Sequence, residues 1–210
     1  MNSKTYITKN IGYPVKKIAR KGFDVNKRTI MFIFTLLLAA CTNETDEQIV
    51  ETTSSSKNAL QLHAVFINEK NEIIGKAVIS EAKQGVLITL NASKLPPGSH
   101  GFHIHEKGVC EPEKQFESAG AHFNPFQKKH GTLNPEGPHA GDLPNIIVAN
   151  DGSVNQQILA PLVTLKENKR HSLLKPEGTA LIIHEKPDDY KTDPAGNAGK
   201  RIACAVMKKT

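Results

Sequence analysis

The sequence predicts an all-β domain that forms an antiparallel barrel or sandwich. Eight short runs rich in Val, Ile and Leu recur between residues 60 and 207, with Gly, Pro, Asn or Asp between them. None of these runs repeats its apolar residues with the period of a helix. Closely spaced short strands separated by turn residues are typical of antiparallel sandwiches and barrels. Because Trp is absent and aromatic residues make up only 5% of the chain, Val, Ile and Leu must fill the core.

The first three expected strands follow one another closely. Residues 60–68 and 72–80 are rich in Val and Ile, and the polar turn Glu69-Lys70-Asn71 joins them. Residues 85–91 alternate apolar and polar side chains, as expected for a strand with one buried face. Leu95-Pro96-Pro97-Gly98 ends this part of the chain, because a sheet interior rarely accepts proline.

Five more strands are expected beyond this break. They cover residues 102–105, 145–150, 153–159, 179–184 and 201–207. Asp151-Gly152 lies between two of them and is a hairpin signal. These segments complete the antiparallel domain.

Residues 106–142 contain no expected strand and are dense in Gly and Pro. Compact domains rarely contain structureless loops of this length, so the segment needs ties to the rest of the fold. Cys110 offers one tie. A shared metal ion offers another, with ligands His122, His130, His139 and Asp142.

The N-terminal segment is expected to be removed during export. Residues 30–40 form an apolar run after Lys27-Arg28, shorter than the roughly 20 residues that span a membrane. Leu38-Ala39-Ala40-Cys41 resembles a bacterial lipoprotein box; an ordinary secretory signal is the alternative. We therefore divide the chain into a lipoprotein signal peptide (1–40), a flexible tether (41–58) and one domain (59–210).

The positive charge of the chain comes from the segment expected to be removed. The formal net charge is +6, but residues 1–40 hold eight Lys or Arg and one acid. Of the totals of 27 basic and 21 acidic residues, 19 and 20 remain in residues 41–210. No basic stripe with interleaved aromatic residues survives, so nucleic acid is excluded as the expected partner.

The three cysteines fit an exported protein. If Cys41 is lipidated, Cys110 and Cys204 remain as a possible pair in an oxidising compartment. A bridge between them would close a loop of about 95 residues, contributing roughly 4–5 kcal/mol in the chain-entropy model. Two buried free thiols are the alternative.

Six histidines and one aspartate form the most informative pattern: His103, His105, His122, His130, His139, Asp142 and His184. Nitrogen ligands with one carboxylate suit zinc and copper. Seven ligands are too many for one tetrahedral ion, which indicates two metals. His103 and His105 lie two apart in an expected strand, so both side chains point to one face. The remaining histidines, His63, His100 and His171, lack such spacing and are expected to be non-ligands.

These motifs resemble the copper/zinc superoxide dismutase family in its bacterial exported form, over about residues 60–207. The matching segments are Gly101-Phe102-His103-Ile104-His105, Ala119-Gly120-Ala121-His122-Phe123-Asn124-Pro125, His139-Ala140-Gly141-Asp142-Leu143, His184-Glu185-Lys186-Pro187-Asp188-Asp189 and residues 196–204. The resemblance implies an eight-stranded antiparallel Greek-key barrel or sandwich with long metal-binding and electrostatic loops.

The resemblance also implies a role for each residue of the site. Copper would be bound by His103, His105, His122 and His184, and zinc by His122, His130, His139 and Asp142, so that His122 bridges the ions. Asp188 would fix the rings of His103 and His130. Cys110 and Cys204 occupy the disulfide positions of the family.

The implied activity is the conversion of superoxide to dioxygen and hydrogen peroxide, with His122 supplying a proton and Arg201 guiding the anion. Lys191 and Lys200 are weaker candidates for the same guidance. A non-catalytic module that stores or delivers copper and zinc is the alternative; some family members lack a copper ligand, but here every position is filled.

Lipidated Cys41 would anchor the exported protein at the cell envelope, in the periplasm or on the outer face of the membrane. Both a homodimer and a monomer remain open. Removal of zinc should loosen residues 106–142 before the strands.

Overall fold

The structure of the chain is a computed structural model that describes residues 60–209. The expected signal peptide, the tether and Cys41 lie outside this range. The described residues form nine strands: β1 (Gln61–Asn68), β2 (Ile73–Ala82), β3 (Gly85–Ala92), β4 (Gly98–His100), β5 (Phe102–His105), β6 (Ile146–Val148), β7 (Val154–Ala160), β8 (Thr179–His184) and β9 (Arg201–Met207). Two 3-10 helices, Pro112–Lys114 and Glu117–Ala119, accompany them.

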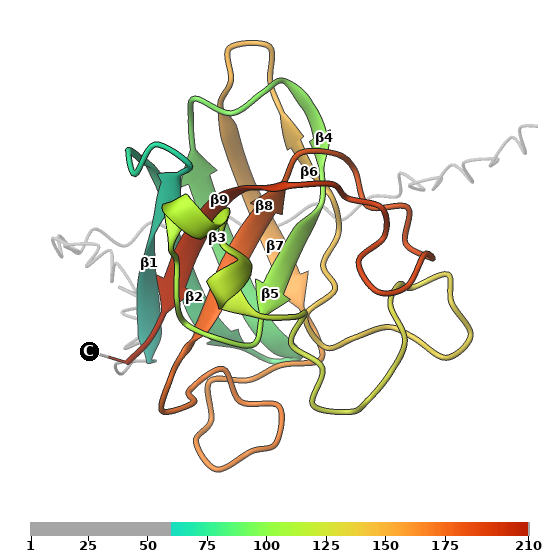
Figure 1. Cartoon of the computed structure of the whole chain (residues 1–210). Helices are drawn as coiled ribbons and strands as arrows, with labels where there is room; N and C mark the ends of the chain where they lie inside the picture. Colours follow the sequence, from blue (N-terminus) through green and yellow to red (C-terminus); the bar gives the residue numbers. More distant parts are fainter. Residues whose placement is uncertain (1–59, 210) are drawn as a thin grey trace, which may run out of the picture. The chain divides into compact units, whose positions relative to one another are not determined.

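The strands form a curled antiparallel sheet, an open barrel to which a two-stranded sheet is added (Figure 1). Seven strands pair in the order β5-β8-β9-β1-β2-β3-β7, and β4 pairs with β6. Gly101 alone separates β4 from β5, and a hairpin connects β6 to β7, in which Ala149 N–H donates to Ser153 O at 2.8 Å. Neighbours such as β3 and β7 are distant in sequence, as in a Greek key. The predicted antiparallel all-β class is confirmed.

The ninth strand is a difference from the sequence prediction. β4 is a three-residue strand that follows Pro96-Pro97, so its sequence carries only turn signals. It forms because the chain changes partner at Gly101: β4 pairs with β6, whereas β5 pairs with β8. The eight runs expected from the sequence are all strands, and β4 is an additional strand directly before the expected strand 102–105.

The core lies inside the barrel and is lined by alternate residues of its strands. Val86, Ile88 and Leu90 of β3 are fully buried, and their neighbours point outward. β8 differs because it is buried on both faces. Leu181 and Ile183 face the main core, whereas Ala180 and Ile182 join a second apolar cluster beneath the loop that follows β5. β8 therefore supports both the barrel and that loop.

Residues 106–142 contain no strand, as expected, but the middle and the C-terminal end of this loop pair with β5. Phe123 N–H donates to Ile104 O at 2.8 Å, and Ile104 N–H donates to Gly141 O at 2.9 Å. Isolated bridges also join His105 to His122 and His103 to Asp142. The loop thus returns twice to the strand that carries the first two candidate ligands. Within residues 60–209, no helix has the length and apolar character needed to cross a bilayer.

Candidate metal centre

β5 and β8 carry three of the candidate ligands. His103 and His105 share one face of β5, with ring centroids 6.5 Å apart. The antiparallel pairing of β5 with β8 places His184, the last residue of β8, beside them. Its ring centroid lies 4.7 Å from that of His103 and 5.8 Å from that of His105. Backbone pairing alone therefore positions these three side chains.

The loop adds the fourth imidazole, that of His122. Its backbone pairs with β5, which brings its ring centroid to 4.1 Å from that of His103 and 4.9 Å from that of His105. One nitrogen of each ring lies within 4.8 Å of those of the other three, the ring of His184 included. The structure thus gathers all four residues expected to bind copper.

The unpartnered nitrogens of these four rings fit a metal ion. The buried side-chain atoms that lack a hydrogen-bond partner among the described residues are His103 Nδ1, His105 Nε2, His122 Nε2 and His184 Nε2. A buried polar atom without a partner is costly, so their convergence needs an explanation. The opposite nitrogens are all engaged, for example His105 Nδ1 with Gly120 O at 2.9 Å. Four imidazole nitrogens with fixed outer contacts are a donor set suited to copper.

A second group of ligands converges on Asp142. Its Oδ1 lies 2.8 Å from His122 Nδ1, 3.1 Å from His130 Nδ1 and 3.2 Å from His139 Nδ1. Its Oδ2 accepts hydrogen bonds from the backbone N–H groups of Gly131 and His139. Zinc–ligand bonds of about 2.0–2.1 Å give a tetrahedral edge of roughly 3.3 Å, close to these separations. The set fits zinc, and His122 belongs to both groups.

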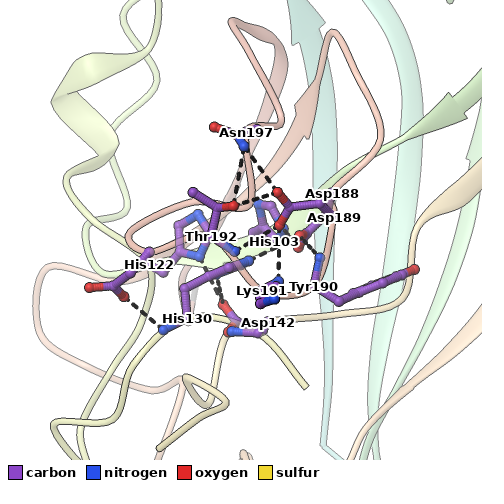
Figure 2. Close-up of polar contacts among 12 residues, drawn as sticks. His103, His122, His130, Asp142, Asp188, Asp189, Tyr190, Lys191, Thr192 and Asn197 are labelled. Carbon is purple, nitrogen blue, oxygen red and sulfur yellow. Dashed lines mark hydrogen bonds and ion pairs between the residues drawn. The ribbon is translucent and has the colours of Figure 1, made fainter. Parts of the chain in front are cut away.

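Asp188 connects the two groups by hydrogen bonds to one histidine ring of each (Figure 2). Its Oδ2 accepts a hydrogen bond from His103 Nε2 at 2.8 Å, and its Oδ1 accepts one from His130 Nε2 at 3.0 Å. Asn145 holds the backbone of Asp188 through two hydrogen bonds of 2.9 Å. Gly196 is required nearby, because its φ is +61° and a Cβ there would overlap the Asp188 carboxylate. Asp188 thus fixes one ring of each group.

Burial and hydrogen bonding set the electrostatics of the site. Burial lowers the pKa of His184 to about 2 and that of His122 to about 4, so both rings are neutral ligands. It also lowers the pKa of His103 and His105. At His130, burial opposes the charged form, but Asp142 and Asp188 outweigh it and raise the pKa to about 9. Neutral rings therefore gather on one side, and the carboxylates on the other.

Arg201 lies at the edge of the first group. It opens β9 opposite His184, and its charge contributes to the lowered pKa of His105 and His184. Its Nη1 donates to Phe116 O at 2.8 Å and its Nη2 to Gly120 O at 2.9 Å. Nη2 also lies 3.3 Å from the Glu117 carboxylate. The guanidinium is therefore held by the loop and partly balanced by one acid.

The predicted disulfide is present. Cys110 and Cys204 are bonded, with Cα atoms 5.8 Å apart, and tie the loop to β9. The alternative of two free thiols is wrong.

The other three histidines lie outside the two ligand groups, as expected. His63 is exposed on β1, and His171 packs against Phe126. His100 is buried, and its two ring nitrogens lie 2.8 Å from the carbonyl oxygens of Pro96 and His184. Lys191 and Lys200 are exposed.

Sequence reasoning missed several residues that organise the site. Asn145 holds Asp188, Glu117 pairs with Arg201, and Asp193 accepts a hydrogen bond from His130 N–H at 2.8 Å. Asp189 accepts hydrogen bonds from Lys191, Thr192 and Asn197 and so folds the turn after Asp188 (Figure 2). None of these residues belongs to a spacing pattern that would mark it, because each contact spans distant segments or an irregular turn.

An antiparallel barrel with one buried four-histidine group and one three-histidine, one-aspartate group defines a two-metal protein of copper and zinc. Residues 73–207 match the family model described as copper/zinc superoxide dismutase (SODC). The chain belongs to this family. Membership of this family confirms the predicted function, an oxidoreductase that dismutates superoxide with copper and zinc.

Relatives from several bacteria support the assignment to this family. Superoxide dismutase [Cu-Zn] 1 of Aquifex aeolicus is 61% identical over 150 residues, which cover 71% of this chain and 88% of the relative. The solved structure of a SOD-like protein from Bacillus subtilis has a TM-score of 0.67 at 45% identity, covering 69% of this chain and 97% of that one. The Cu/Zn superoxide dismutase from Brucella abortus has a TM-score of 0.57 at 33% identity, covering 70% and 99%.

Proposed function

We propose that His103, His105, His122 and His184 bind copper, and that His122, His130, His139 and Asp142 bind zinc. The single observation that supports this assignment best is the set of four buried, unpartnered nitrogens, one on each residue of the first group. The engagement of His122 Nδ1 with Asp142, while its Nε2 faces the first group, supports its role as the bridge.

The residues around the first group have separate tasks in the reaction. Copper, when bound, supplies the one-electron chemistry that oxidises one superoxide to dioxygen and reduces a second to hydrogen peroxide. Arg201 attracts the anion and orients it by charge and hydrogen bonding. When the Nε2 of His122 is not bound to copper, it would hold a proton and deliver it to the reduced substrate, and the second proton of hydrogen peroxide would come from solvent. Asp188 and the Gly120 carbonyl keep the rings of His103 and His105 in fixed orientations.

A module that stores or delivers metal without turnover is the second candidate. Arg201 argues against it, because its guanidinium is held beside the copper group by two backbone carbonyls and storage needs no anion-guiding group. The test is the rate of superoxide removal by metal-loaded protein. His122→Ala should reduce the rate at least a hundredfold and Arg201→Ala at least tenfold. The exposed His63→Ala is the matched control and should leave the rate unchanged. A metal-loaded wild type that fails to remove superoxide would support the storage module, and activity that survives both site changes would contradict the proposed mechanism.

We also propose that the protein is exported and anchored by lipid at Cys41. The short apolar run before Cys41 supports export, and the Cys110–Cys204 disulfide supports an oxidising compartment. Mass spectrometry of the mature N-terminus tests the anchor. A lipid-modified residue 41 is the expected result, and an unmodified Cys41 or cleavage at another position would contradict it.

A further inference from the structure

Four segments meet at one end of the barrel. Gln61 at the start of β1 pairs with Ser80, and Ala82 pairs with Gly85 across the turn that contains Lys83. Val86 pairs with Ala160, so the loop 161–178 leaves from the same end, and Thr179 pairs with Met207 there. In Figure 1 this loop, the start of β1 and the end of β9 lie at the lower end of the sheet. We call this the basic end: Lys83, residues 161–178 and Lys208–Lys209.

The basic end has more positive than negative side chains. Its loop contributes Lys166, Lys169, Arg170 and Lys175, so that with Lys83, Lys208 and Lys209 there are seven cations. All are exposed except Lys175, which is partly buried. Three acids accompany them: Glu81, Glu167 and Glu177.

Each of these acids is already engaged. Glu81 accepts hydrogen bonds from the Thr164 hydroxyl at 2.7 Å and Leu165 N–H at 2.6 Å, and it lies 3.8 Å from Lys166. Glu167 pairs with Lys209 at 2.6 Å and Glu177 with Lys175 at 3.7 Å. Within residues 60–209, Lys83, Lys169, Arg170 and Lys208 have no carboxylate within ion-pair distance. A net surplus of four positive charges therefore faces outward.

The described chain begins at this same end, with Leu60 exposed beside the basic end. Only residues 42–59 separate it from Cys41, and a chain of that length reaches about 20–25 Å if it is flexible. We propose that the basic end docks on the anionic headgroups of the membrane that holds the lipid anchor. This inference rests on the anchor proposed at Cys41. A lipid and a basic patch together give firmer attachment than either gives alone.

Docking in this orientation would leave the copper side accessible. β8 runs from Thr179 at the basic end to His184, five residues further on, or roughly 17 Å at about 3.3 Å per residue. Arg201 pairs with His184 at the far end of the same strands. The end of β8 and β9 that carries His184 and Arg201 would therefore point toward the aqueous medium, from which the anion arrives, whereas Arg170 and Lys175 line a pocket together with His122 and His139.

Vesicle binding of a lipid-free chain tests the surface separately from the anchor. The chain starting at residue 42, loaded with copper and zinc, is sedimented with vesicles of phosphatidylcholine alone or mixed equally with phosphatidylglycerol. We expect at least tenfold stronger partitioning into the anionic vesicles, lost when salt is raised from about 0.05 to 0.5 M. Lys169→Glu with Lys208→Glu removes four units of positive charge, which equals the surplus, and should therefore abolish the preference for anionic vesicles, since each charge contributes roughly fivefold.

The charge-matched control is Lys70→Glu with Lys94→Glu. Both lysines are exposed at the opposite end of the barrel, after β1 and after β3. The control should bind anionic vesicles like the wild type, and both double variants should retain superoxide removal. Equal weakening by the two pairs would overturn the docking surface, as would salt-insensitive binding of the wild type. A rate that falls with the basic-end pair would instead assign these lysines to anion steering.

Two further experiments distinguish the membrane from two other possible occupants of the basic end. The segment before Leu60 contains Glu44, Asp46, Glu47 and Glu51. If vesicle binding appears only after these four are changed to their amides, this segment occupies the basic end and the proposal fails. Binding to dextran sulfate but not to vesicles would assign the surface to a polysaccharide. Because no arm uses a lipidated chain, an unmodified Cys41 would refute the anchor without deciding these results.

Discussion

The two halves of the loop between β5 and β6 are held by different forces. The first half, residues 106–121, is tied to β9 by the disulfide and buries Phe116 completely in an apolar cluster. The second half, residues 124–142, exposes its large apolar side chains: Phe126 is 38% and Leu133 67% exposed. Polar contacts to Asp142, Asp188 and Asp193 hold it instead. The first half therefore folds with the barrel, whereas the second half depends on its metal ligands.

Zinc removal should have the largest effect on this contrast. A structural zinc ion contributes on the order of 10 kcal/mol to the segment that it folds. Chelation should therefore accelerate amide hydrogen exchange in residues 124–142 by a hundredfold or more and leave residues 106–121 nearly unchanged. This sharpens the expectation drawn from the sequence, which treated residues 106–142 as one unit. Equal acceleration in both halves would show that zinc holds the whole loop.

Loss of the disulfide should have the complementary effect. Cys110→Ser with Cys204→Ser opens a bridge between residues 94 apart in sequence. The chain-entropy model gives a loss of about 4–5 kcal/mol in the free energy of unfolding, measured by denaturant titration. In the zinc-loaded variant, exchange should rise in residues 106–121, and the second half should stay protected. A variant that loosens mainly at residues 124–142 would contradict the division.

The pH dependence of the metal-free protein should separate the halves again. The folded-state pKa of His130 is raised to about 9, so its contribution to stability is fully present below about 6.5 and is lost as the pH rises through 9. The loss is on the order of 3 kcal/mol. Exchange in the second half should therefore accelerate over this window, beyond the intrinsic base-catalysed rate, and the first half should not follow. His130→Gln should remove the effect.

Below about pH 6.5, the stability of the metal-free protein should change with pH in the opposite direction. The folded-state pKa of His122 is lowered to about 4 and that of His184 to about 2, both by burial. Stability is therefore fully present above about 6.5 and is lost as the pH falls through these values, because the unfolded rings gain protons first. The metal-free protein should be most stable near pH 6.5, which thermal unfolding across pH would measure.

The sequence predicts more of the barrel and the ligands than of the contacts between them. Short runs rich in Val, Ile and Leu locate eight strands, and the spacing of His103 and His105 places both on one face of β5. The sequence does not predict β4, because its pairing with β6 is decided by tertiary context and not by its three residues. The roles of Asn145 and Glu117 are not predicted for a related reason. Asn145 contacts Asp188, 43 residues away, and Glu117 contacts Arg201, 84 residues away. Local patterns carry no information on such contacts.

The smallest predicted effect concerns Glu117, which links the first half of the loop to substrate guidance. Its carboxylate lies 3.3 Å from Arg201 Nη2, and its side chain is 71% exposed. The negative charge partly cancels the field of Arg201, while the carbonyls of Phe116 and Gly120 position the guanidinium without it. Glu117→Gln should therefore raise kcat/KM for superoxide about two- to threefold at low salt, with a smaller gain at high salt. Glu113→Gln, at an exposed neighbour that forms no ion pair within residues 60–209, is the control and should change the rate less. A fall in the rate would mean that Glu117 orients Arg201, and the first half of the loop would then position the guanidinium through a side chain as well as through its backbone.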